Sequence, residues 1–85
     1  MKKHCMITFR SVTPAQRGES VLRSASLSCT LQRTPRWMEE KGCGYCLRLP
    51  CTLLPEALML LRRNTVAFQK VYTVHDNGTV EEWTL

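Results

Sequence analysis

Long apolar runs are missing from this sequence, and their absence excludes a membrane span. The longest uninterrupted apolar run, from Ala57 to Leu61, has five residues, whereas a helix that crosses a bilayer needs about 20. Lys2 and Lys3 precede an apolar stretch that polar residues soon interrupt, so we expect no signal peptide and a mature chain that starts near Met1. We therefore expect a cytoplasmic protein that does not contact a membrane.

The sequence also lacks the motifs of common enzymes and of nucleic-acid-binding domains. It has no glycine-rich phosphate loop, no His-Glu-x-x-His helix and no nucleophile elbow. An aromatic and basic RNA-binding strand, a helix-turn-helix pattern and a continuous basic run are absent as well. The two histidines and seven acidic residues form no catalytic pattern, and we expect no enzyme.

Composition and charge indicate one basic globular domain over residues 1–85. Hydrophobic residues make up 44% of the 85 residues, with only four Gly and four Pro, which is the composition of a folded chain. The formal charge is +5, and all 12 basic residues lie before residue 71. Eight of these are arginines, whose planar guanidinium suits carboxylate and phosphate groups. An anionic partner is therefore a reasonable hypothesis.

Alternation and turn residues predict the elements of the first half. Met6–Val12 is rich in β-branched and aromatic residues, and apolar residues alternate with serines and threonines from Val21 to Gln32, so two strands are predicted. The loop Pro14–Ser20 would join them as a hairpin. Thr34 followed by a proline is a helix start, which predicts a short helix over Pro35–Lys41.

The second half predicts a helix and a further hairpin. Leu54 or Pro55 to Arg63 places apolar residues on one face, with acidic and basic residues at the ends that the helix dipole favours. Asn77-Gly78 is a two-residue turn signal, and it would place Tyr72 opposite Trp83. The prediction is an α+β domain of order β-β-α-α-β-β, with an antiparallel sheet of two hairpins and two short helices.

Three of the five cysteines lie within nine positions and suggest a metal site. The cluster is predicted to form a tight turn between the two predicted helices. Cys43-x-x-Cys46 has the spacing of two zinc ligands from one turn, and Cys51 could supply a third. The sequence does not rank the candidates for a fourth ligand, which are Cys29, Cys5, His4 and His75. Zinc is therefore a candidate cofactor, and unligated thiols in a reducing cytosol are the alternative.

The tetrapeptide Cys43-Gly44-Tyr45-Cys46 is similar to the active site of glutaredoxin-like and disulfide-isomerase proteins of the thioredoxin fold. That resemblance, over four residues, implies a thiol redox pair. In that family a long helix follows the first cysteine and lowers its pKa. Here Pro50 would break such a helix, and the predicted helix comes before the pair.

The predicted function is that of a small non-enzymatic binding protein, a regulator or inhibitor of the kind carried by phages and mobile elements. It would dock an arginine-rich face on an acidic surface of a partner protein. The residues expected to bind this partner are Arg33, Arg36, Arg48, Arg62 and Arg63. The alternatives are a zinc-stabilised nucleic-acid-binding module, which would use Cys43, Cys46 and Cys51, and a redox protein with a Cys43/Cys46 pair.

Overall fold

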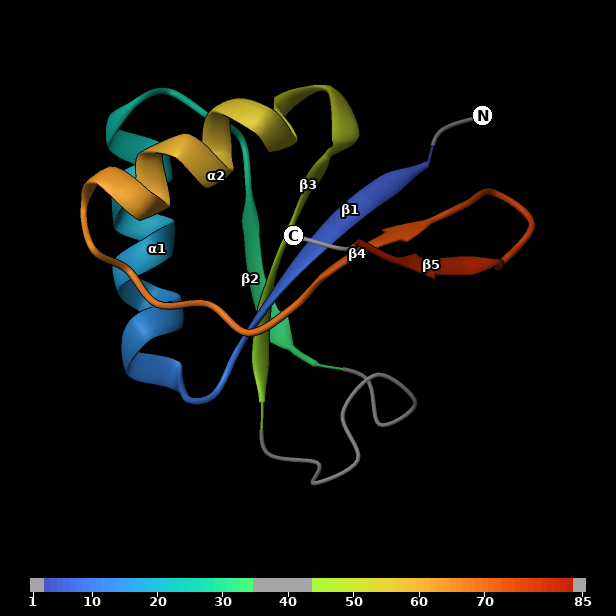
Figure 1. The fold of residues 1–85 in the computed structure, drawn as a ribbon, viewed down its shortest axis with the longest axis horizontal. Helices are drawn as coiled ribbons and strands as arrows, with labels where there is room; N and C mark the ends of the chain where they lie inside the picture. The colour runs from blue at the N-terminus through green and yellow to red at the C-terminus, as the bar shows by residue number, and fades with distance from the viewer. Residues whose placement is uncertain (1–2, 35–43, 84–85) are drawn as a thin grey trace.

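The structure, a computed structural model, describes residues 3–34 and 44–83. Within these ranges the chain forms one antiparallel sheet and two α-helices (Figure 1). The elements in chain order are β1 (His4–Phe9), α1 (Val12–Ser24), β2 (Thr30–Arg33), β3 (Tyr45–Pro50), the 3₁₀ turn η1 (Cys51–Leu53), α2 (Leu54–Arg63), β4 (Val71–Val74) and β5 (Val80–Glu82). The predicted α+β class, with an antiparallel sheet and two helices, is confirmed.

The topology places each helix between two strands that run in the same direction. The strand order is β2-β3-β1-β4-β5, and all neighbouring strands are antiparallel. Helix α1 links β1 to β2 across β3, and α2 links β3 to β4 across β1. With η1 set aside, β1 to β4 and the two helices therefore have the β-α-β-β-α-β order of ferredoxin-like folds, and β5 adds an edge strand. Figure 1 shows both helices on the same side of the sheet.

Helix α1 occupies a segment for which the sequence predicted a strand end, a loop and a second strand. Ser11 is its extended N-cap residue, and Pro14 lies in the first turn, where backbone amides have no helical partner and proline is tolerated. Ala15, Gly18 and Leu22 are the buried residues of this helix, at the spacing of one helical face. The strand predicted over Val21–Gln32 is thus wrong for its first nine residues, and β2 in this part of the chain is Thr30–Arg33.

Both helices end without the glycine that usually marks a helix terminus. Ser26 and Thr65 have φ values of 62° and 56°, in the left-handed region. In each case the amide two residues past the C-cap donates to a carbonyl in the last turn, Leu27 to Leu22 and Val66 to Leu61, both at 2.9 Å. These are Schellman motifs. Because a serine, Ser26, takes the place of the common glycine after α1, the sequence did not indicate where this helix ends.

The second correction concerns the cysteine cluster, which was predicted to be a turn between two helices. Residues Tyr45–Pro50 instead form β3, which pairs with both β1 and β2. Leu47 and Leu49 belong to the core under the helices, while Cys46 and Arg48 alternate with them and lie on the opposite face. The predicted helix Pro35–Lys41 lies outside the described residues.

Helix α2 is confirmed over Leu54–Arg63, and it covers the sheet as predicted. Leu54, Leu58 and Leu61 are buried. They join a core made by the helix-facing residues of the sheet, which include Ile7, Phe9, Leu47, Leu49 and Val71. In the described part of the chain, α1 and α2 are the α-helices, and neither is long and apolar enough to cross a bilayer.

The C-terminal hairpin is present, but its register differs by one residue from the prediction. Tyr72 pairs with Glu82 and not with Trp83. The turn has one residue more than a two-residue loop, because the Gly78 amide donates to the His75 carbonyl and Gly78 has φ +89°. This is a type I turn followed by a left-handed glycine, which is a common three-residue hairpin.

Candidate functional site

The cysteines fall into different environments, and two of them form a disulfide. Cys5 in β1 and Cys51 at the start of η1 are joined, with a Cα–Cα distance of 5.1 Å and a sequence separation of 46 positions. The prediction that the cysteines are thiols or metal ligands is wrong for this pair. Cys5 is fully buried, and its sulfur lies 3.4 Å from the Thr73 hydroxyl. Cys51 is partly exposed.

Cys46 is a free thiol that lies in β3 on the face away from the helices. It is fully buried, and burial raises the pKa of its thiol to about 11, although hydrogen bonding from Thr34 and Gln32 opposes this rise. A thiol with this pKa is about 10⁴-fold more often protonated than ionised at pH 7, so Cys46 is a poor nucleophile.

Cys29 is the other free thiol of the described residues, and it belongs to the core. It is 8% exposed and packs with the residues beneath the helices. Burial raises the pKa of its thiol, and Arg23 opposes that rise. The Arg23 guanidinium donates to the Cys29 carbonyl at 3.2 Å, which fixes the backbone just before β2.

The structure does not bring the described cysteines of the predicted zinc set together. Cys46 lies within β3 and Cys51 follows its end, so about 16 Å of extended chain separates them. Cys51 is bonded to Cys5, and a disulfide sulfur offers no thiolate to a metal. Among the described residues there is no group of three or more metal-binding side chains. Cys43 lies outside these residues, and the zinc module stays a prediction.

The predicted partner-binding arginines do not share one face. Arg33 ends β2 and lies over the Tyr45 ring, with 5.8 Å from its guanidinium carbon to the ring centroid. Arg48 is exposed on the sheet face opposite the helices, while Arg62 and Arg63 are exposed in the last turn of α2. Arg36 lies outside the described residues.

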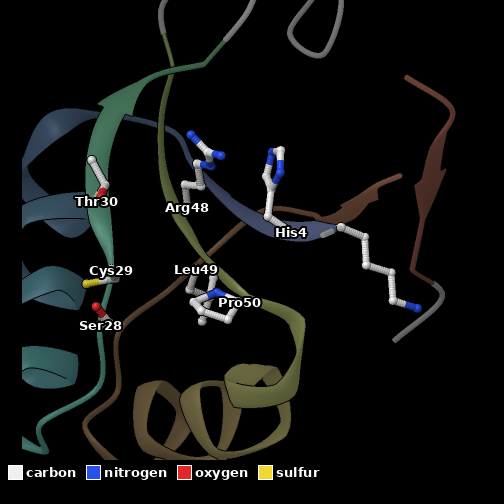
Figure 2. A pocket seen from close by; sticks show the side chains of 8 residues that line it. His4, Ser28, Cys29, Thr30, Arg48, Leu49 and Pro50 are labelled. Carbon is white, nitrogen blue, oxygen red and sulfur yellow. The ribbon is translucent and has the colours of Figure 1, made fainter. Parts of the chain in front are cut away.

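A pocket of about 260 Å³ opens at the end of the sheet where β1 and β2 begin and β3 ends (Figure 2). Its basic lining consists of Lys3, His4 and Arg48. Figure 2 shows His4 and Arg48 projecting side by side from neighbouring strands. The strand register agrees, because Arg48 lies opposite Met6, two residues along β1 from His4, and such diagonal neighbours are about 7 Å apart.

The remaining lining of this pocket is polar on one side and apolar on the other. Ser28 and Thr30 supply hydroxyl groups, and the exposed Pro50 supplies carbon surface, whereas Leu49 is buried in the core beneath the pocket. Cys29 also borders the pocket, but its sulfur points away from His4 and Arg48 in Figure 2. The pocket is therefore a cationic site and not a thiol site.

Comparison of the chain with models of known protein families gives a match. A family model described as "Putative Se/S carrier protein-like" matches residues 4–73. The chain belongs to this family. The searches of curated proteins and of solved structures found no match.

The match to the Se/S carrier protein-like family covers all five cysteines and leaves β5 outside. The cysteines were predicted from the sequence, whereas the pocket of His4 and Arg48 was not. The alternation of residues in Tyr45–Pro50 could have indicated this pocket, because it is typical of a strand with Arg48 on its polar face. Because this strand was not predicted, Arg48 was not expected to lie beside a residue of β1.

Proposed function

We propose that this protein carries sulfur or selenium on a cysteine thiol and delivers it to a partner. The observation that carries the proposal is the family match over residues 4–73, because the matched span includes every cysteine of the chain. A carrier needs a thiol that can attack a donor and later be attacked by an acceptor. It needs no catalytic set, in agreement with a sequence that lacks the common ones.

Elimination among the cysteines points to Cys43 as the carrier residue. Cys5 and Cys51 are joined to each other, and Cys29 and Cys46 are buried with raised thiol pKa values. Thiol exchange requires a thiolate that the other reactant can reach. Cys43 lies outside the described residues, and it is the carrier residue of this proposal.

The proposed loading step is an exchange without net oxidation. The Cys43 thiolate attacks the outer sulfur of a donor persulfide R–S–SH, a new S–S bond forms, and R–S⁻ leaves. The product is Cys43–S–SH. The high pKa of the neighbouring Cys46 thiol supports a carrier over a Cys43/Cys46 redox pair, because a protonated Cys46 would attack this persulfide slowly.

Delivery to an acidic partner protein is the second part of the proposal. Arg33, Arg48, Arg62 and Arg63 are exposed, and no ion pair between any of them and another described residue is present. Such unpaired charges steer association with an acidic surface, and the rate of that association falls as salt rises. Because they lie on different faces, we propose that the pair Arg62 and Arg63 forms the contact.

The test of the carrier proposal is the mass of the intact protein after treatment with glutathione persulfide. Wild type is expected to gain one sulfur atom, which dithiothreitol removes. Cys43→Ser should gain none, while Cys29→Ser and Cys46→Ser should gain as much as wild type. An equal gain in wild type and Cys43→Ser would refute the assignment to Cys43, and no gain in wild type would refute the carrier function.

A further inference from the structure

The pocket between β1, β2 and β3 gathers hydrogen-bond donors and positive charge from three strands. His4, Arg48 and Thr30 lie in one row, because Thr30 is directly opposite Arg48 and His4 is its diagonal neighbour on the other side. All three lie on the sheet face away from the helices, and all three line the pocket. Strand pairing therefore holds this row in place, unlike a chance group of surface side chains.

The positive charge in this pocket is not neutralised within the described structure. No carboxylate is found among the described residues that line it. The pKa of the His4 ring is lowered by burial first and by the charge of Arg48 second. The charge of Arg48 thus disfavours the protonated form of the His4 ring, and a bound anion would favour that form.

We propose that this pocket binds the doubly charged oxyanion of a sulfate or phosphate group. Arg48 is the main contact, since its planar guanidinium can donate two parallel hydrogen bonds to two oxygens of the anion. The His4 ring and the Thr30 hydroxyl are the further donors. This goes beyond the proposed function and does not depend on it, because no cysteine takes part.

The volume and the apolar side of the pocket also suit a ligand that is larger than a free oxyanion. A volume of about 260 Å³ is several times the roughly 30 Å³ that one water molecule occupies in the liquid, so an oxyanion would leave room beside it. Pro50 borders the pocket and is exposed, so it could contact an organic part of the ligand. Small organic phosphates therefore fit the same site as free sulfate.

The experiment is an NMR titration of the two histidine rings with sodium sulfate, at fixed pH and at an ionic strength held constant with sodium chloride. Sulfate stays doubly charged throughout. The His4 ring signals are expected to shift along a saturable curve. Those of His75, which is paired with Glu81 at the hairpin turn, are expected to stay in place and serve as the control within the molecule.

Two matched variants separate a built site from general attraction to a basic protein. Arg48→Gln should weaken the apparent affinity by at least about tenfold, because a charge-assisted bidentate contact is lost. Arg10→Gln removes the same charge from an exposed residue beyond the other end of β1 and should change the affinity less than twofold. Because Arg48 is exposed, its replacement should leave the fold intact, which circular dichroism checks.

Three results would overturn the proposal: no saturable shift of His4, equal shifts of His4 and His75, or equal affinity in Arg48→Gln and wild type. Ribose 5-phosphate as a second probe distinguishes the two sources of the anion. Tighter binding than sulfate would assign the pocket to an organic phosphate, and equal binding would assign it to a free oxyanion. Both results support the site. A protein that binds sulfate but takes up no sulfur atom would keep this inference and refute the carrier function.

Discussion

Loss of the Cys5–Cys51 disulfide should reduce the stability of this small domain by a large fraction. The bond closes a loop of 46 residues and joins β1 in the centre of the sheet to the turn before α2. In the chain-entropy model, a cross-link over a loop of this length destabilises the unfolded state by about 4 kcal/mol at 25 °C. Domains of this size have a total stability of only about 5 to 10 kcal/mol.

The change to make is Cys51→Ala. Cys51 is partly exposed, so the loss of its sulfur leaves little cavity. Replacement of the fully buried Cys5 would also leave a cavity in the core, and the cost of that cavity would add to the measured change in stability. We expect the free energy of unfolding to fall by about 2 to 4 kcal/mol, since measured disulfides often contribute less than the chain-entropy value.

The assay is urea unfolding of oxidised wild type, wild type with reductant, and Cys51→Ala with and without reductant. Wild type should lose stability on reduction to about the level of the variant, and the variant should not respond to reductant. A change below about 0.5 kcal/mol on reduction, with an unaltered urea dependence, would show that this cross-link does not hold the fold together.

Three further predictions concern single positions. Cys46→Ala should remove a pH dependence: because the folded thiol has a pKa of about 11 against an ordinary 9.0, the unfolded chain ionises first, and wild type should lose up to about 2 to 3 kcal/mol between pH 9 and 11 relative to the variant. Urea unfolding at both pH values measures this, and parallel losses in the two proteins would contradict it. Gly18→Val should destabilise by about 2 to 3 kcal/mol, because even a Cβ at this position would lie 3.1 Å from Phe9 Cζ and 3.3 Å from Leu47 Cδ1; a thermal midpoint equal to that of wild type would show that the core can yield. Thr65→Gly should stabilise by about 1 kcal/mol, because Thr65 has φ 56° and a β-branched residue is strained there; a loss of stability in chemical unfolding would mean that the Thr65 side chain contributes more than its strain costs.

The parts of the fold that the sequence predicted are those with a strong local signal. Helix α2 has an apolar face, suitable charges at both ends and an asparagine at its C-cap, and it was predicted within one residue. The hairpin was found from Asn77-Gly78, but its register was wrong because the turn closes between His75 and Gly78. A turn pair indicates where the chain reverses, and a shift of one residue in that turn changes every cross-strand pair.

The parts that failed depended on tertiary contacts or on unusual helix ends. Helix α1 contains a proline and a glycine, and Ser26 just beyond its C-cap has a positive φ, so its local signals favoured a loop. The site failed for a related reason, because β3 was interpreted as a turn around cysteines. The disulfide between residues 46 positions apart and the pocket of His4 and Arg48 both depend on pairing β3 with β1, which no local pattern shows.

The position of the added sulfur atom tests the carrier proposal most directly. After treatment with glutathione persulfide and alkylation, cleavage behind Lys41 and Arg48 yields a peptide of residues 42–48, which holds both Cys43 and Cys46. Tandem mass spectrometry can then assign the extra sulfur within it. We expect an alkylated persulfide at Cys43 and no extra sulfur at Cys46. Extra sulfur on Cys46, on Cys29 or on no cysteine would contradict it.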